Sequence, residues 1–293
     1  MIIVNLISGL GNQLFQYAIA RNISLKKKIE LKLDISFFST QTLRNYQLDK
    51  FNIAENLASI QDLKRFTNLR SKHSVRYKIQ RNIDNLLPKH KRKIFSESDL
   101  WIYEESLEKI SNHTYIDGYW QNKKYLKDLH PIVLEELTLK NVDNNDYSHY
   151  LFLISKSNSV SIHIRRGDYL GDKNANEIFG VLSIDYYNRA IDHIKTQVEN
   201  PLFFIFSDDL NWAEEQFKIQ ATFVKIENGQ KPYLELDLMS KCKHNIIANS
   251  SFSWWGAFLN RNSSKIVIMP KRWVLDENIN AKINLKLSNW IQL

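Results

Sequence analysis

Residues 2–14 read IIVNLISGLGNQL, and this stretch decides the fold class. Its first six residues are mostly apolar and rich in β-branched side chains, which is typical of a buried strand, and Gly9 and Gly11 form a turn behind them. Residues 12–26 then carry apolar side chains at helical spacing, and residues 29–34 alternate apolar and polar as a strand does. A strand, a helix and a strand in this order predict a parallel sheet.

The same alternation continues along the chain. Strands are expected at 113–118, 160–164, 202–206, 222–226, 245–248 and 265–269. Helices are expected at 122–137, 184–198, 211–218, 234–242 and 250–259. The polar, turn-rich stretch 141–148 separates two such series, so we expect two doubly wound α/β domains, 1–145 and 146–293. A ligand would then lie in a cleft between them, at the carboxyl ends of both sheets.

Bulk composition narrows the class of protein and its partners. The 293 residues carry a net charge of +8, which favours an anionic partner such as a phosphorylated small molecule, a nucleic acid or an anionic membrane face. The single cysteine, Cys242, excludes an internal disulfide and a metal site built from several cysteines, and it fits a reducing compartment. The apolar start lacks a basic leader and no run is long enough to span a membrane, so we expect a cytoplasmic protein.

One segment is strongly basic. Between Lys64 and Lys93 there are 11 lysines and arginines against one acidic residue, Asp84. This segment is either a solvated helical face or a surface that docks on anionic lipid headgroups or nucleic acid. It lacks the interleaved aromatic side chains of single-strand binders, so nucleic acid is not the expected partner.

The first motif is the turn Gly9-Leu10-Gly11-Asn12-Gln13-Leu14. A dinucleotide fingerprint needs a third small residue where Leu14 stands, which argues against NAD. Two glycines still let the backbone approach an anion at a helix N-terminus, and Asn12 adds a neutral donor. The alternative is a plain strand-to-helix turn.

The second motif, His163 to Tyr169, reads HIRRGDY at the end of a strand. Strand alternation places His163 and Arg165 on one face and Arg166 on the other. The planar guanidinium of an arginine at this edge matches a phosphate bidentately. Asp168 is expected to neutralise Arg166 and to fix the turn at Gly167. The alternative is a purely structural ion pair on a loop.

Two further motifs follow later strands. Asp208 and Asp209 offer carboxylates to a ribose or a guanine edge, or an N-cap to the next helix. No Asp-x-Asp metal clamp occurs in the chain. The stretch 249–256 reads NSSFSWWG, where hydroxyls that open a helix form a neutral phosphate cradle and an aromatic ring can stack on a base. Gly256 inside that helix indicates close packing.

Taken together, these motifs resemble the bacterial α-1,2-fucosyltransferases of glycosyltransferase family eleven. The matching stretches are GLGNQLFQYA (9–18), GYWQ (118–121), SIHIRRGDY (161–169), SIDYYNRAI (183–191), FIFSDD (204–209) and IIANSSFSWWGAFL (246–259).

The resemblance implies a GT-B fold, with the acceptor domain first, the donor domain second and the last helix packed back on the first domain. It implies metal-independent, inverting transfer of L-fucose from GDP-β-L-fucose to the 2-hydroxyl of a terminal galactose, without a cofactor. The resemblance assigns Arg165 and Asn12 to the leaving diphosphate, His163 to the guanosine and Asp209, rather than Asp208, to guanine. The remaining implied donor-binding residues are Gly11, Asp208, Asn249, Ser250, Ser251 and Phe252. Implied acceptor residues are Gln13, Tyr119, Trp120, Asp168, Tyr169 and Trp254.

Three alternatives stay open at this point. One is a fucosyltransferase of α-1,3 or α-1,6 linkage, another a protein O-fucosyltransferase, and the third a non-catalytic nucleotide or nucleic-acid binder that uses the basic segment. For the enzyme, a lipid-linked O-antigen or capsule glycan at the inner membrane face is the expected acceptor, with the basic segment making peripheral contact with anionic lipid.

Overall fold

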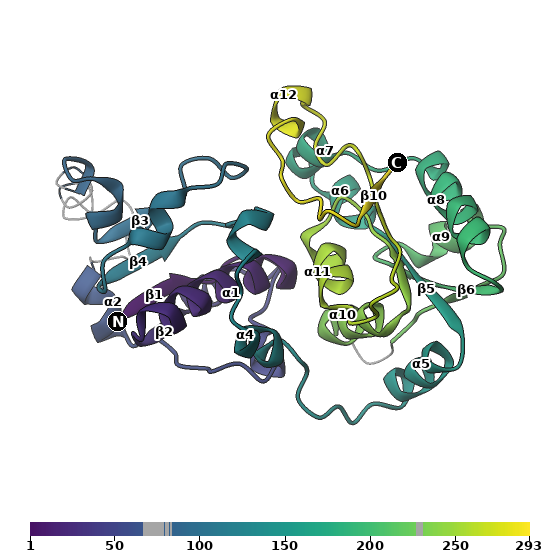
Figure 1. The fold of residues 1–293 in the computed structure, drawn as a ribbon, viewed down its shortest axis with the longest axis horizontal. Helices are drawn as coiled ribbons and strands as arrows, with labels where there is room; N and C mark the ends of the chain where they lie inside the picture. The colour runs from purple at the N-terminus through teal and green to yellow at the C-terminus, as the bar shows by residue number, and fades with distance from the viewer. Residues whose placement is uncertain (67–78, 80–81, 83, 227–230) are drawn as a thin grey trace. The chain divides into compact units, whose positions relative to one another are not determined.

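The computed structural model describes residues 1–66, 79, 82, 84–226 and 231–293, except for the side chain of Asp168. The chain divides into two compact units, Met1–Lys140 and Asn141–Leu293 (Figure 1). The division falls where the polar stretch 141–148 begins, close to the boundary expected after residue 145. Half of the basic segment, including Lys72, Arg76 and Lys78, lies outside the described residues.

Unit 1 is built on a parallel four-stranded sheet in the order β2-β1-β4-β3. Its strands are β1 (Ile2–Asn5), β2 (Leu31–Asp34), β3 (Ile94–Ser96) and β4 (Thr114–Asp117). In the register, Val4 of β1 lies between Leu33 and Ile116 of its two neighbours. All four residues of β1 are buried, as the apolar run predicts.

The helices of unit 1 are short apart from the first. They are α1 (Leu10–Lys27), α2 (Ile60–Phe66) and α4 (Pro131–Glu136), with 3-10 turns η1 (Ser36–Ser39), η2 (Leu48–Lys50), η3 (Lys89–Lys91), η4 (Glu105–Lys109) and η5 (Lys123–Leu126). The predicted β-α-β opening is confirmed. Helix α1 ends at Lys28, which adopts a left-handed conformation, and Lys26 and Lys27 occupy its last turn, where the helix dipole favours cations.

The helix expected over 122–137 is wrong. The structure has η5 there, then α4, because Pro131 cannot donate a backbone hydrogen bond inside a helix and keeps the residue before it out of the helical region. His130 has an extended backbone and its Nδ1 accepts from the Ile132 amide, so it caps α4. The spacing of the apolar residues alone does not predict this break in the helix.

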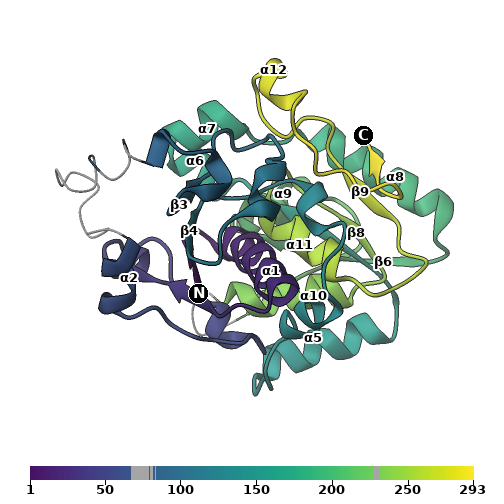
Figure 2. The same ribbon diagram turned by 60° about the vertical axis from the view of Figure 1, so that its left-hand side comes forward.

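Unit 2 carries a parallel six-stranded sheet in the order β10-β9-β8-β5-β6-β7. Its strands are β5 (Asn158–Ile164), β6 (Pro201–Ser207), β7 (Ala221–Phe223), β8 (His244–Ile246), β9 (Val267–Met269) and β10 (Ile291–Gln292). Its helices are α5 (Asn145–Ser155), α6 (Gly167–Gly171), α7 (Lys173–Phe179), α8 (Ile184–Gln197), α9 (Leu210–Gln216), α10 (Pro232–Lys241), α11 (Ser251–Leu259) and α12 (Glu277–Asn280). The turned view in Figure 2 shows these helices around the strands of this sheet.

Helices α10 and α11 pack closely against each other. A Cβ added to Gly256 would lie 3.0 Å from the Met239 Cβ, which confirms the packing reason predicted for this glycine. At the end of the chain, β10 pairs with β9 and the last helix, α12, belongs to unit 2, while packing of the last helix on the first domain stays a prediction. Among the described residues, no helix is both long and apolar enough to cross a membrane.

Candidate active site

Each sheet has a topological switch point, which is the pair of neighbouring strands at which the order of the strands along the sheet changes direction. In unit 2 it lies between β5 and β8, and in unit 1 between β1 and β4. Ligands of open parallel sheets bind outside the carboxyl ends of the strands at such a point. The sequence motifs follow these four strands directly: 163–169 follows β5, 249–252 follows β8, 9–13 follows β1 and 118–121 follows β4.

Arg165 follows β5 and lies beside Asp208, which follows the neighbouring strand β6. The register explains this, because Ile164 pairs with Ser207 and the next residue on each strand is therefore adjacent. The Arg165 Nε is 3.5 Å from the Asp208 Oδ2, and both side chains are about four-fifths buried. The planar guanidinium of Arg165 thus lies at the switch point of unit 2, with the Asp208 carboxylate on one side of it.

Asp208 and Asp209 fix the turn that the sequence assigned to Asp168. The Asp208 Oδ1 accepts from the Arg166 amide at 2.9 Å and from the Gly167 amide at 3.0 Å. Arg166 donates through its Nε to the Asp209 Oδ2 at 3.2 Å and lies over the Trp212 ring. The side chain of Asp168 lies outside what the structure describes. Arg166 therefore has a structural partner that the sequence did not identify.

Asp209 also caps α9, since its Oδ1 accepts from the Trp212 amide at 3.2 Å. Both of its oxygens are thus engaged within unit 2, one by a helix and one by Arg166. The capping alternative weighed from the sequence is what the structure shows for this residue.

His163 and Phe252 lie close together on either side of the switch point. Their ring centroids are 5.4 Å apart. Burial and the charge of Arg165 hold the pKa of His163 well below its usual range, so the imidazole is neutral at physiological pH. Within the described part of the chain its Nδ1 has no hydrogen-bond partner. An aromatic ring and a neutral imidazole beside an arginine form a surface that suits a nucleotide base and its diphosphate.

Glu235 is a site residue that sequence reasoning missed. It lies on α10, and burial raises its pKa to about 7, while the Arg165 charge lowers it and the Asp208 charge raises it. A carboxyl group is thus held near Arg165 in a poorly hydrated position. No local motif marks Glu235; its position in a buried helix directly before the strand β8 was the only available signal.

The stretch after β8 divides into a structural part and an open part. The Asn249 Nδ2 donates to the carbonyls of Phe179, Gly180 and Trp273, and the residue is almost fully buried, so its amide ties loops together. Ser250 caps α11 by accepting from the Phe252 amide. Ser251 and Phe252 are partly exposed at the helix N-terminus, where free backbone amides favour an anion.

In unit 1, Asn12 is held in place by two side chains. Its Oδ1 accepts from the Gln121 Nε2 at 2.6 Å, and its Nδ2 donates to the Ser8 Oγ at 2.9 Å. The carboxyl ends of β1 and β4 are thereby connected at the switch point. Gly9 precedes the helix in an ordinary extended conformation, and a Cβ added there would meet nothing within 4 Å. The surrounding protein therefore gives no reason for a glycine at this position.

Glu97, which follows β3, holds the turn after β4. Its two carboxylate oxygens accept from the amides of Tyr119 at 2.7 Å and Trp120 at 2.9 Å. Burial raises its pKa to about 7 against the effect of these two amides. A Cβ on Gly118 would lie 2.5 Å from the Glu97 Cβ, so this approach requires a glycine. Glu97 is a second residue that the sequence did not identify.

Most of the side chains expected in the acceptor site are buried within their own unit. Trp254 and Trp120 are fully buried in their own units, where Trp254 stacks on Phe258 and Trp120 contacts Phe95, so neither offers a platform to a sugar.

Gln13 is also fully buried, and it donates to two backbone carbonyls. Tyr169 donates to the Asn249 carbonyl and stacks on Phe179. Tyr119 stays partly exposed, while Gly11 lies buried in α1.

In the described ranges, no group of three or more His, Cys, Asp or Glu side chains is arranged to hold a metal ion. Metal independence stays a prediction. The positive charge that the structure places at the switch point of unit 2 is that of Arg165.

Solved structures with a similar fold include two fucosyltransferases of the GT-B type. Arabidopsis thaliana FUT1, solved as a mutant in complex with GDP, matches 95% of this chain and 71% of its own at a TM-score of 0.52 and 12% identity. The NodZ α-1,6-fucosyltransferase, soaked with GDP-fucose, matches 87% of this chain and 91% of its own at a TM-score of 0.50 and 14% identity. The predicted GT-B type α/β fold is confirmed.

The sequence gives the family. The profile of glycosyl transferase family 11 matches residues 1–293, and the chain belongs to that family. The Escherichia coli O-antigen biosynthesis glycosyltransferase WbnK is 33% identical over 97% of this chain and 98% of its own length. An Escherichia coli α-1,2-colitosyltransferase is 34% identical over 96% of this chain and 95% of its own length. The family predicted from the motifs is thus confirmed, and the protein is a glycosyltransferase.

Proposed function

We propose that this protein transfers L-fucose from GDP-β-L-fucose to the 2-hydroxyl of a terminal galactose, with inversion at the anomeric carbon. The observation that carries the proposal is the placement of Arg165, His163 and Phe252 around the switch point of unit 2, where the arginine suits the charge of a nucleoside diphosphate and the Phe252 ring can stack on its base. The human galactoside α-(1,2)-fucosyltransferase 1, 28% identical over 34% of this chain, supports the acceptor and the linkage.

The chemistry needs a stabilised leaving group. The bond between the sugar anomeric carbon and the β-phosphate oxygen breaks, GDP leaves with an added negative charge, and the acceptor oxygen bonds to the opposite face of that carbon and releases its proton to solvent. Arg165 and the N-terminal amides of α11 are oriented donors that stabilise this charge as it develops. Such preorganised donors act without a metal, which supports the expected metal independence.

A second nucleotide sugar is an alternative donor to GDP-L-fucose. One relative of 34% identity is a colitosyltransferase, and colitose is fucose without one ring hydroxyl. A site that hydrogen-bonds that hydroxyl discriminates strongly against the sugar that lacks it, whereas a site that does not bond it accepts both. We infer that fucose is the donor sugar, and the comparison of the two nucleotide sugars tests this directly.

The acceptor that we propose is a galactose-terminated glycan of the O-antigen type, carried on lipid at the inner membrane face. The O-antigen relative and the basic segment between Lys64 and Lys93 support this choice. Replacing Lys72, Arg76 and Lys78 with glutamine should reduce co-sedimentation with anionic liposomes, and unchanged binding would contradict the docking role.

The decisive experiment uses purified protein with GDP-L-fucose or GDP-L-colitose and a panel of β-1,3- and β-1,4-galactosides. We expect GDP release with fucose and an α-1,2 linkage in the product by NMR. Turnover only with the colitosyl donor would replace the donor sugar, and an α-1,3 or α-1,6 linkage would replace the acceptor position. Absence of turnover with both donors would contradict the enzymatic proposal for these acceptors.

A further inference from the structure

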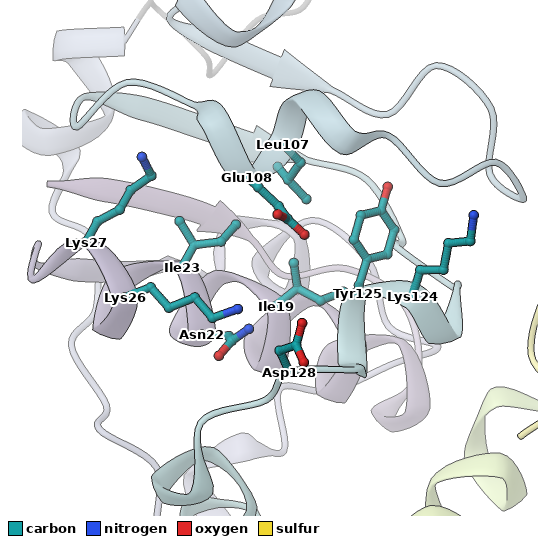
Figure 3. Close-up of a pocket in the computed structure, with 10 residues that line it drawn as sticks. All are labelled: Ile19, Asn22, Ile23, Lys26, Lys27, Leu107, Glu108, Lys124, Tyr125 and Asp128. Carbon is teal, nitrogen blue, oxygen red and sulfur yellow. The ribbon is translucent and has the colours of Figure 1, made fainter.

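Unit 1 contains a pocket at the opposite end of α1 from Asn12. It has a volume of about 170 Å³ and opens between the C-terminal half of α1, the turn η4 and the segment around η5 (Figure 3). Its lining residues are Ile19, Asn22, Ile23, Lys26, Lys27, Leu107, Glu108, Lys124, Tyr125 and Asp128. The volume is too small for a nucleotide and suits one sugar ring.

Asn22 is the residue that marks this pocket as a binding site. Only 5% of the residue is exposed, and its Oδ1 accepts from the His130 amide at 3.0 Å. This bond fixes the orientation of the side chain, so its Nδ2 is directed at the pocket, where the described part of the protein offers it no acceptor (Figure 3). A side-chain amide that is fixed by one bond and opens into a pocket can donate to a ligand without first losing an internal partner.

Two carboxylates approach the same space. Glu108 enters from η4 and Asp128 from the segment after η5, on opposite sides of the apolar side chains of Ile19 and Ile23 (Figure 3). Glu108 also accepts from the Tyr103 hydroxyl at 2.6 Å, which fixes its position.

The lining therefore combines acceptors, one fixed donor and a small apolar surface. The hydroxyl groups of a sugar donate to carboxylates and accept from an amide, while its C–H face packs on aliphatic side chains.

Other ligand classes fit this lining less well. A free phosphate would face the carboxylates of Glu108 and Asp128 as well as three lysines, so a lining of mixed charge suits a neutral polar ligand better than a small anion. A cation would face Lys26 and Lys27, and these side chains form no ion pair with the described residues.

The distance between the pocket and Asn12 determines which acceptors can reach the pocket. Asn12 and Asn22 are both on α1, and ten residues at a rise of about 1.5 Å separate them by roughly 15 Å along the helix axis. A disaccharide that binds near Asn12 is too short to reach the pocket, whereas a longer oligosaccharide can.

We propose that the pocket around Asn22 is a second carbohydrate subsite, which holds one neutral hexose of an oligosaccharide acceptor at a distance from the sugar that is modified. This inference rests on the proposed transfer to a glycan for its biological meaning. Its physical content, the binding of a sugar at Asn22, is testable without any transfer.

The test compares a short and a long galactose-terminated acceptor, lactose and lacto-N-tetraose, by calorimetric titration and by steady-state kinetics with GDP-L-fucose. The variant Asn22→Asp keeps an oxygen for the His130 amide but replaces the donor by an acceptor and adds a negative charge, whereas Asp128→Asn removes a negative charge from an exposed side chain, so the two variants change the charge of the pocket in opposite directions. We expect each variant to weaken binding of the tetrasaccharide and raise its KM roughly 2- to 10-fold, the value of one hydrogen bond, with kcat and the lactose KM unchanged. Asp143→Asn, an exposed aspartate of unit 2, is the matched control and should change none of these values.

The outcomes separate the subsite from the proposed function. Equal tetrasaccharide affinity in the wild type and in both variants would overturn the subsite, as would a tetrasaccharide that binds no better than lactose to the wild type. If Asn22→Asp does not fold, Asp128→Asn decides alone. Absence of fucosyl transfer together with tetrasaccharide binding that both variants weaken would contradict the proposed function and support the subsite.

Discussion

Replacing Arg165 with lysine tests the core of the proposed site, because lysine keeps the charge and loses the planar fork. The Arg165 Nε lies 3.5 Å from the Asp208 Oδ2, so this edge of the guanidinium contacts that carboxylate. A lysine ammonium cannot both pair with Asp208 and hold a diphosphate at two points. Loss of one preorganised donor to a developing charge costs about 2.7–4 kcal/mol of transition-state stabilisation, or a 10²- to 10³-fold fall in kcat. Arg165→Ala should abolish transfer and also weaken GDP binding.

Arg166→Lys is the matched control for this experiment. Arg166 pairs with Asp209 and lies 4.6 Å over the Trp212 ring, contacts that a lysine can largely keep. We expect its kcat to stay within roughly 3-fold of the wild-type value, since the net cost of a changed exposed cation–π contact is about 0.5–1 kcal/mol and falls on stability. GDP release gives kcat, and calorimetry gives the Kd of GDP. Near-normal turnover in Arg165→Lys, or an equal loss in Arg166→Lys, would refute the assignment of the diphosphate to Arg165.

Three further predictions concern backbone space, pH and metal. Gly118→Ala should lower the free energy of unfolding by about 1–3 kcal/mol, because the added Cβ would lie 2.5 Å from the Glu97 Cβ and 2.9 Å from Trp120. Gly9→Ala should leave the free energy of unfolding unchanged in denaturant titration but raise the KM of the donor. A destabilised Gly9→Ala variant would contradict the open space around Gly9. Burial raises the pKa of Glu235 from 4.5 to about 7, so ionisation is harder in the folded state and stability should fall as the pH rises from about 4.5 to 7. Glu235→Gln should flatten that part of the pH profile in thermal denaturation, and an unchanged profile would count against the shift. Activity should survive EDTA, and activity lost in EDTA but restored by Mn²⁺ would show a metal requirement.

The sequence predicted the elements that carry the site because β-branched runs and helical spacing are local signals. The opening β-α-β, the strands that end at Ile164 and Ser207 and the position of Arg165 are all local in this sense. The broken helix at Pro131 shows the limit of that reasoning, because one missing N–H outweighs several well-spaced apolar residues.

Partners across strands were less predictable. Asp168 is next to the arginines in sequence, yet Asp208 and Asp209 supply the contacts described for Arg165 and Arg166, because parallel pairing of β5 with β6 brings residues more than forty positions apart to one edge. Glu235 and Glu97 were missed for the same reason, since each acts through neighbours that the sheet order supplies. The tryptophans carry no local signal that separates a core residue from a sugar platform.

The stretch 118–121 positions Asn12. Gly118 admits Glu97, whose oxygens hold the amides of Tyr119 and Trp120, and the next residue, Gln121, donates to Asn12. Two residues beside this link, Ser8 and Trp120, have positive φ values of 67° and 60°, a region that side-chain-bearing residues rarely occupy. Such strain costs of order 1–3 kcal/mol per residue and persists only where the surroundings enforce it. Both strained residues flank the hydrogen bonds that orient the Asn12 amide. Their strained backbone therefore helps to fix this side chain at the switch point of unit 1.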